Sequence, residues 1–183
     1  MKKTVAVIGS RGAIGNAVVD TLLADESVEA VFKFSRAEIT EHDDKVKHIF
    51  IDIEDEESIK QATESLPEDT KFDLIFVATG ILHDEKNVFP EKSIKDISFD
   101  KLIKVLTINT IGPTLVGKYF IPYLRKDSKS TFAFLSARVG SISDNKLGGW
   151  YSYRASKTAL NQIIRNFSIE VARSNKNAIF IGQ

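Results

Sequence analysis

The sequence has no cysteine and no excess of charge of either sign. Without cysteine the chain can form no disulfide, no thiolate metal site and no cysteine nucleophile, and it fits a reducing compartment. Lysine plus arginine equals aspartate plus glutamate at 25 each, so the overall charge offers no attraction for nucleic acid or an anionic membrane. No apolar run approaches the ~18 residues of a membrane span. We therefore expect a soluble, cytoplasmic protein whose partners are small molecules or other proteins.

Short apolar segments alternate with longer segments of helical spacing along the chain. The short segments are rich in Val, Ile and Phe, as buried strands are, and cover residues 5–8, 30–34, 48–51, 74–78, 131–135 and 178–181. Helical spacing covers residues 13–23, 56–66, 99–124 and 152–173. This alternation predicts an α/β fold of three layers, a Rossmann-type doubly wound parallel sheet of six strands with helices on both faces. The 183 residues have the length of one domain, 1–183, in which the polar segment 81–98 is a candidate lid or a plain insertion.

A glycine-rich turn follows the first predicted strand, in the stretch "VAVIGSRGAIGNAVV" at residues 5–19. In dinucleotide-binding proteins one glycine permits a tight turn, a second lets the backbone approach a pyrophosphate, and a third allows close packing of the next helix. Gly9, Gly12 and Gly15 have the spacing for these roles, and N–H groups at the start of the helix would hold the phosphates. The turn predicts a dinucleotide site, and the alternative is a tight turn without a ligand.

The residues after the second and third strands bear on the choice of nucleotide. NAD-binding proteins carry a carboxylate after the second strand, whereas this chain has Ser35 and Arg36 there. Arg36, with Arg11 from the glycine turn, could pair with the extra phosphate, so the sequence favours NADP(H) over NAD(H). The alternative is that both arginines are solvated surface residues. Asp52, at the end of the third strand, could hold the adenine amino group or could simply close a strand.

Tyr153 and Lys157 lie four residues apart on the last predicted helix and hence on one face of it. A tyrosine with a pKa of about 10 is a poor acid at neutral pH, and a neighbouring lysine ammonium favours the phenolate and lowers that pKa. The pair could exchange a proton with a carbonyl or alcohol oxygen. No metal site is expected, because His42, His48 and His83 are scattered along the chain.

Six motifs, in order along the chain, resemble those of the short-chain dehydrogenase/reductase superfamily. They are "GSRGAIG", "FSR", "VATG", "INTIG", "LSARVGSISDNKLGGW" and "YRASK", and the stretches "ATGILH", "EKSI" and "WYSYRASKTALN" are most similar to its C-factor-like branch. The resemblance implies an NADP-dependent oxidoreductase that transfers hydride between NADP(H) and a carbonyl or alcohol substrate. In that superfamily long helices such as 99–124 and 152–173 pair across a two-fold axis, which implies a homodimer or homotetramer.

The resemblance also assigns roles to individual residues. Tyr153 would be the general acid in reduction and the base in oxidation, while Lys157 would hold the nicotinamide ribose and lower the Tyr153 pKa. Asn109 would hold a water that relays protons to the lysine; without the resemblance, a side chain bonded to its own backbone is the simpler interpretation. The positions that would contact the cofactor are Gly9, Ser10, Arg11, Gly12, Ile14, Gly15, Ser35, Arg36, Asp52, Ile53, Gly80 and Lys157.

Two parts of the substrate site depart from the family pattern. Ala137 stands where the substrate-orienting serine is usual, so Ser136, next Ser141, or else Ser143 would supply the hydroxyl, unless the site works with fewer donors. The chain ends at Gln183, where the family usually continues into a segment that covers the substrate, so we expect much of the substrate pocket to be missing.

Two other functions stay open at this point. A non-catalytic NADP(H)-binding sensor or signalling protein would bind the cofactor without turnover, and the unusual serine position and the C-factor likeness favour it. A methyltransferase also has a glycine-rich first turn, but binding of S-adenosylmethionine would leave Arg11, Arg36 and the pair of Tyr153 and Lys157 unexplained.

Overall fold

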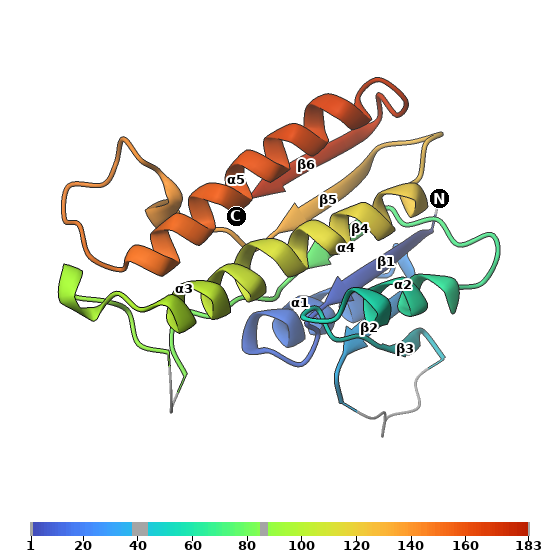
Figure 1. Cartoon of the computed structure of the whole chain (residues 1–183). Helices are drawn as coiled ribbons and strands as arrows, with labels where there is room; N and C mark the ends of the chain where they lie inside the picture. Colours follow the sequence, from blue (N-terminus) through green and yellow to red (C-terminus); the bar gives the residue numbers. More distant parts are fainter. Residues whose placement is uncertain (1, 38–43, 85–87, 183) are drawn as a thin grey trace.

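The computed structural model describes residues 2–37, 44–84 and 88–182, and within them six strands form one sheet (Figure 1). The strands are β1 (Lys3–Ile8), β2 (Val28–Ser35), β3 (Val46–Phe50), β4 (Leu74–Val77), β5 (Ser130–Phe134) and β6 (Ala178–Gly182). Every neighbouring pair is parallel, and the order is β3-β2-β1-β4-β5-β6. The predicted Rossmann-type parallel sheet is therefore confirmed.

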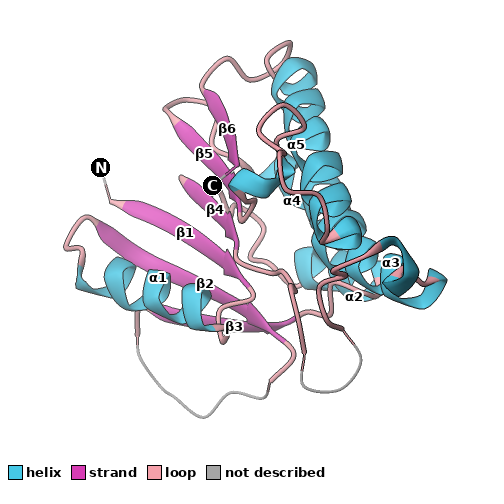
Figure 2. Cartoon of the chain, turned by 90° about the vertical axis from the view of Figure 1, so that its left-hand side faces the viewer, coloured by secondary structure: helices cyan, strands magenta, loops and turns pink. Residues whose placement is uncertain are grey.

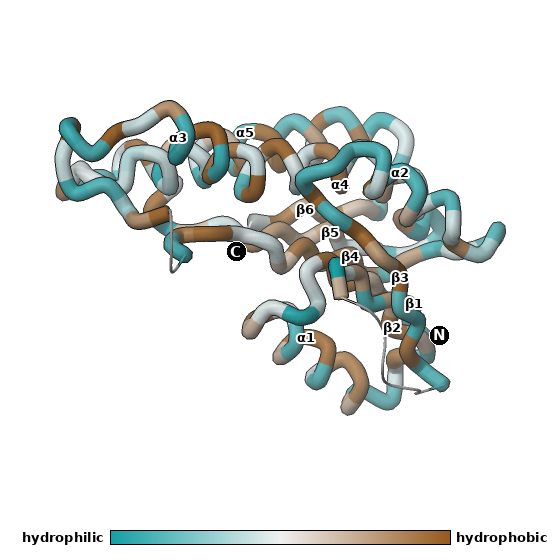
Figure 3. Tube along the Cα trace, turned by 60° about the horizontal axis from the view of Figure 1, so that its bottom comes forward, coloured by the Kyte–Doolittle hydropathy of each residue, from teal (hydrophilic) through white to brown (hydrophobic). Residues whose placement is uncertain are grey.

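Helices lie on both faces of this sheet. On one face lies α1 (Ala13–Ala24), and on the other lie α2 (Glu56–Glu64), α4 (Gly112–Phe120) and α5 (Tyr151–Val171) (Figures 2 and 3). Alternate strand residues enter two apolar clusters. Val7 packs in the cluster of Val19 from α1, whereas Phe34 packs edge-on to Phe120 of α4 in the larger cluster, which also holds Leu160 of α5. Because the central strands are buried on both faces, their sequences are continuous apolar runs.

The strand order brings the ends of β1 and β4 together. The chain runs outward from β1 to β3 and then crosses to β4 on the other side of β1. Ile8 pairs with Val77, so the two strands end side by side. Open α/β sheets bind their ligands at such a point, where the strand order reverses. The glycine-rich turn after β1 and the segment 78–80 after β4 both begin there.

The single helix predicted over 99–124 is interrupted. The structure divides it into α3 (Phe99–Leu106), a π-helical turn (Thr107–Ile111), α4 and a 3₁₀ turn (Ile121–Tyr123). Apolar spacing does not reveal a π turn, since it changes the helical register by only one residue. Pro122 lies in the 3₁₀ turn, where the absence of its N–H group opposes a longer helix.

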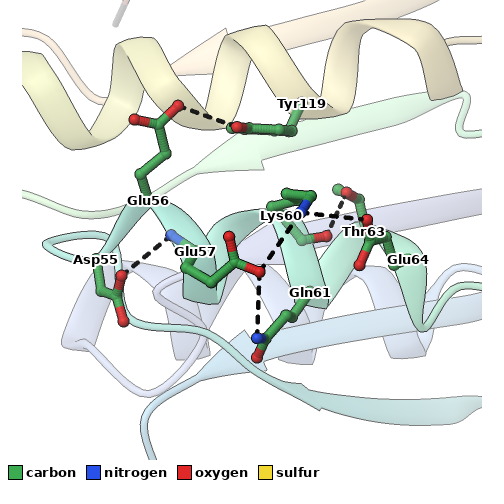
Figure 4. A network of polar contacts seen from close by, with 8 residues as sticks. All are labelled: Asp55, Glu56, Glu57, Lys60, Gln61, Thr63, Glu64 and Tyr119. Carbon is green, nitrogen blue, oxygen red and sulfur yellow. Dashed lines mark hydrogen bonds and ion pairs between the residues drawn. The ribbon is translucent and has the colours of Figure 1, made fainter.

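Polar contacts fix α2 against α4 (Figure 4). Asp55 caps α2 by accepting a hydrogen bond from the Glu57 N–H at 3.0 Å. The Glu56 carboxylate accepts bonds from the Lys118 ammonium at 2.7 Å and the Tyr119 hydroxyl at 3.0 Å. These two bonds, that from Lys118 first, hold the pKa of Glu56 below its ordinary value. The loop that follows β3 therefore ends at a helix that is anchored by its first turn.

Helix α5 begins without a cap of its own. Its N-cap residue, Trp150, has a left-handed backbone with φ 51° and makes no side-chain capping bond. The buried Glu91, 1% exposed, takes this place: its carboxylate accepts from the Ser152 N–H at 3.3 Å, and its carbonyl accepts from the Trp150 N–H at 2.6 Å. A carboxylate is favourable at a helix N-terminus. Part of the polar segment 81–98 is thus packed against the start of α5.

Replacement of Glu91 by alanine is expected to lower the free energy of unfolding by about 1–3 kcal/mol, because the Ser152 N–H loses its acceptor. Glu91→Gln keeps an acceptor oxygen and should recover part of this loss. Urea unfolding followed by circular dichroism measures the unfolding free energy of both variants. The control is Glu170→Ala, which removes an exposed carboxylate from α5. An unfolding free energy that is unchanged in Glu91→Ala would contradict the capping role.

Candidate active site

A cavity of about 440 Å³ opens at the carboxyl ends of β1, β2, β3 and β4. It is lined by residues at the ends of these strands and in the turns that follow them, and by Ile108 of the π turn. Seven of the predicted cofactor positions line it: Gly9, Arg11, Gly12, Ser35, Arg36, Ile53 and Gly80. Residues from four separate turns, far apart in the sequence, therefore meet around one space.

The glycine turn is shaped by two close approaches. Gly9 has φ +81°, which favours glycine, and a Cβ on it would come within 2.7 Å of Thr79 Cγ2. A Cβ on Gly15 would overlap the Gly9 carbonyl oxygen, so the first turn of α1 packs directly on the glycine turn. Gly12 is the N-cap of α1 and provides no capping side chain. The backbone N–H groups at the start of α1 are thus the donors available to an anion in the cavity.

Three other predicted cofactor positions, Ser10, Asp52 and Ile14, do not line the cavity. Ser10 is fully buried, and its hydroxyl donates to the Phe34 carbonyl at 3.3 Å, which ties the glycine turn to β2. The Asp52 carboxylate accepts from the Glu54 N–H at 3.0 Å and is not part of the lining. Ile14, on the exposed side of α1, also lies outside the lining. These three residues are not part of the cavity lining, and their contact with a cofactor stays a prediction.

A carboxylate that the sequence analysis missed lies at the rim of the cavity. Glu54 lines the cavity after β3, and its Oε1 lies 3.9 Å from Nη1 of Arg36, whose side chain is 68% exposed. The other carboxylate oxygen, Oε2, lies 2.6 Å from Nζ of Lys104 on α3. Glu54 belongs to the acidic run 54–57, and nothing in that run distinguishes the residue that faces a cavity from those that face solvent.

Lys157 is buried beside Gly80 and Tyr153. It is 1% exposed, its Nζ donates to the Leu135 carbonyl at 2.7 Å, and Nζ lies 5.6 Å from the centre of the Tyr153 ring. A Cβ on Gly80 would lie 3.3 Å from Nζ, so the ammonium reaches the cavity wall. Burial lowers the pKa of Lys157 to about 8.

The lowered pKa expected for Tyr153 is not found. Burial raises the pKa of Tyr153 above its ordinary value of 10.0. The physical reason is desolvation, which disfavours the charged forms of both side chains, the phenolate of Tyr153 and the ammonium of Lys157. The phenol is therefore protonated at neutral pH.

Asn109 joins two distant segments next to Lys157. It is fully buried in the π turn, its Oδ1 accepts from the Ile81 N–H at 2.7 Å, and its Nδ2 donates to the Ile81 carbonyl at 2.8 Å. The same amide donates to the Ser156 hydroxyl at 3.1 Å, and Ser156 in turn donates to the Tyr153 carbonyl at 2.8 Å. The side chain thus bonds a remote backbone rather than its own, and it holds that backbone against the helix of the Tyr–Lys pair.

The candidate substrate-orienting serines are engaged within the chain. The Ser136 hydroxyl donates to Asn161 Oδ1 at 2.6 Å. The Ser141 hydroxyl lies 3.3 Å from that of Ser143 and accepts from the Asp144 N–H at 3.3 Å. These contacts use polar atoms that a substrate would need, and the choice of serine stays a prediction.

The part of the chain that the structure describes has neither a metal-binding cluster nor a membrane-spanning helix. No group of three or more His, Asp or Glu side chains is arranged to hold a metal ion there, and His42 lies outside the described residues. None of the described helices has the length and apolar character needed to cross a membrane.

A parallel sheet of this strand order, with a glycine turn at its switch point and a Tyr–Lys pair beside the resulting cavity, has the architecture of the Rossmann-type α/β proteins. Residues 3–182 match the short chain dehydrogenase family, and the chain belongs to that family. The resemblance seen in the sequence motifs is thereby confirmed.

Individual relatives agree with this assignment. The 1-hydroxy-2-glutathionyl-2-methyl-3-butene dehydrogenase of Rhodococcus sp. (strain AD45) is 27% identical over 180 residues, which are 97% of this chain and 75% of that protein. The C-signal protein of Myxococcus xanthus is 34% identical over 79 residues, 43% of this chain and 48% of its own length, in agreement with the C-factor likeness. A solved short-chain dehydrogenase/reductase from Burkholderia multivorans with bound NADP is 25% identical, with a TM-score of 0.81 over 94% of this chain and 75% of that chain.

The pKa of Lys157 predicts how stability changes with pH. Its folded-state pKa of about 8 lies below the ordinary 10.5, so the unfolded chain binds more protons between these pH values. The contribution of Lys157 to the unfolding free energy therefore becomes more favourable as the pH rises through this window. We expect a slope of at most ~1.4 kcal/mol per pH unit.

Urea unfolding of Tyr153→Phe and of Tyr153→Phe/Lys157→Met at several pH values measures this contribution, because both proteins lack the titrating phenol at position 153. The unfolding free energy of the protein that keeps Lys157, minus that of the protein with methionine there, should rise between pH 8 and 10.5. Parallel pH profiles for the two proteins would show that the Lys157 pKa is not shifted by burial.

Proposed function

We propose that the chain is an NADP(H)-dependent oxidoreductase that transfers hydride between the nicotinamide and a carbonyl or alcohol substrate. The observation that carries this proposal is the buried Lys157 ammonium, which lies near the Tyr153 ring and close to Gly80 at the cavity wall. Burying a cation is costly, and groups with perturbed pKa values in a cleft are typical of functional sites. The name of the Rhodococcus relative, a dehydrogenase of a hydroxy compound, supports the same class of substrate.

The residues around the cavity fit a dinucleotide. Gly9 and Gly15 allow the tight turn and the close packing of α1 on it, and Gly12 of the same turn lines the cavity, where the start of α1 would bind a pyrophosphate. Ile51 and Ile53 provide an apolar wall for the adenine. Lys157 would hydrogen-bond the ribose of the nicotinamide. When bound, NADP(H) supplies or takes up the hydride.

The proton transfer would belong to Tyr153. In reduction its hydroxyl would protonate the carbonyl oxygen, and in oxidation its phenolate would accept the proton of the alcohol. The raised pKa keeps the phenol protonated at neutral pH, the form that reduction requires. Lys157 would stabilise the phenolate left after proton transfer, and Asn109, through Ser156, would position the helical turn that carries both residues.

The preference for NADP(H) rests on the residues after β2. Ser35 and Arg36 line the cavity where NAD-binding proteins carry a carboxylate, and Arg11 lines it from the glycine turn. Two exposed guanidinium groups at one rim are suited to a phosphate group. The relative from Burkholderia multivorans, solved with bound NADP, supports this assignment.

A second candidate function is that of a non-catalytic NADP(H)-binding sensor or signalling protein. It is favoured by the Ser136 hydroxyl, which is already bonded to Asn161, and by Ala137 at the usual serine position. Such a protein would bind the cofactor without turnover. A cytoplasmic location and assembly into a homodimer or homotetramer also stay predictions.

Tyr153→Phe separates the two functions. If the chain is a reductase, this variant should lose about 10²–10⁴-fold in turnover of a carbonyl that the parent reduces, because the proton donor is gone. Its affinity for NADPH should be unchanged. The measurement is NADPH oxidation followed by absorbance over a panel of aldehydes and ketones.

Tyr151→Phe is the matched control, since Tyr151 lies on the same helix without a lysine four residues later. It should retain the parent turnover. Full activity in Tyr153→Phe would refute the proposed catalytic role, while cofactor binding without turnover of any substrate by the parent would favour the sensor.

A further inference from the structure

Glu54 brings a negative charge to the rim of a cavity that would bind a polyanionic nucleotide. Its side chain is 26% exposed, and its backbone is fixed by the bond from its N–H to the Asp52 carboxylate. A carboxylate at this place repels a phosphate group and competes with it for Arg36, whose Nη1 lies 3.9 Å away. Neutralisation of this carboxylate would therefore favour the binding of NADP(H).

Lys104 supplies the opposite charge from a distant part of the chain. Its Nζ lies 2.6 Å from Glu54 Oε2, so the carboxylate is much closer to the lysine than to the arginine. Lys104 belongs to α3, which continues into the π turn whose Ile108 lines the cavity. The helix that forms one cavity wall thus also carries the cation that holds Glu54 at the rim.

We propose that Lys104 is a specificity-determining residue that acts through Glu54. By pairing with the carboxylate, Lys104 leaves the Arg36 guanidinium available to the additional phosphate of NADP(H). Without Lys104, Glu54 would pair with Arg36 and oppose that phosphate. This inference rests on the proposed function, because it requires that the cavity bind NADP(H).

Calorimetric titration with NADPH and NADH tests the proposal on four proteins: the parent, Lys104→Met, Glu54→Gln and the double variant. At low ionic strength Lys104→Met should bind NADPH roughly three- to tenfold more weakly, with a smaller change for NADH, which lacks the additional phosphate. In the double variant the NADPH affinity should return to the parent level, because the competing charge is gone. The loss in Lys104→Met should shrink as salt is added, since the pair is partly exposed.

Two further variants serve as controls. Lys101→Met removes a positive charge from the same helix and should leave both affinities unchanged. Lys104→Arg keeps the charge and should retain the parent affinity for NADPH. Thermal unfolding of each free variant verifies that the compared proteins are folded.

Three outcomes would overturn the proposal. If the loss of NADPH affinity persists in the double variant, Lys104 acts on the phosphate directly and not through Glu54. If Lys104→Met binds NADPH as the parent does, the lysine has no role in specificity. Both results leave the proposed function intact, whereas a parent protein that binds neither nucleotide would refute the proposed function and this inference with it.

Discussion

The parallel pairing of β1 with β4 is the constraint on which the candidate site depends. Ile8 lies opposite Val77, so the chain turns away from both strands at the same edge of the sheet. Gly9 and Thr79 then approach so closely that a side chain on Gly9 would not fit. The cavity, the position of Lys157 beside Gly80 and the bonds of Asn109 to Ile81 all follow from this meeting of two turns.

The site combines a more buried part and a more exposed part. In the more buried part, burial lowers the pKa of Lys157 and raises that of Tyr153, so the neutral form of each side chain is favoured. In the more exposed part, Arg36, Glu54 and Lys104 are partly accessible to solvent, so their charges are screened and their pairing is sensitive to salt. Proton transfer is suited to the first environment, and selection among charged nucleotides is suited to the second.

The sequence predicts the sheet well because its strands are buried on both faces and are therefore continuous runs of Val, Ile and Phe. It does not predict the π turn around Asn109, since that turn changes the helical register within 99–124 by only one residue. Glu54, Lys104 and Glu91 act through partners 50 or more residues away, and local patterns carry no information on such contacts. Nor does the sequence show that the Ser10 hydroxyl is bonded to the Phe34 carbonyl, and the contact of Ser10 with a cofactor stays a prediction.

The most direct test of the account is a crystal structure of the chain with NADPH. The account predicts the pyrophosphate at the start of α1, the ribose hydroxyls of the nicotinamide within hydrogen-bond distance of Lys157 Nζ, and the additional phosphate beside Arg36. A nucleotide bound outside the cavity, or with its adenine end toward Lys157, would contradict the account.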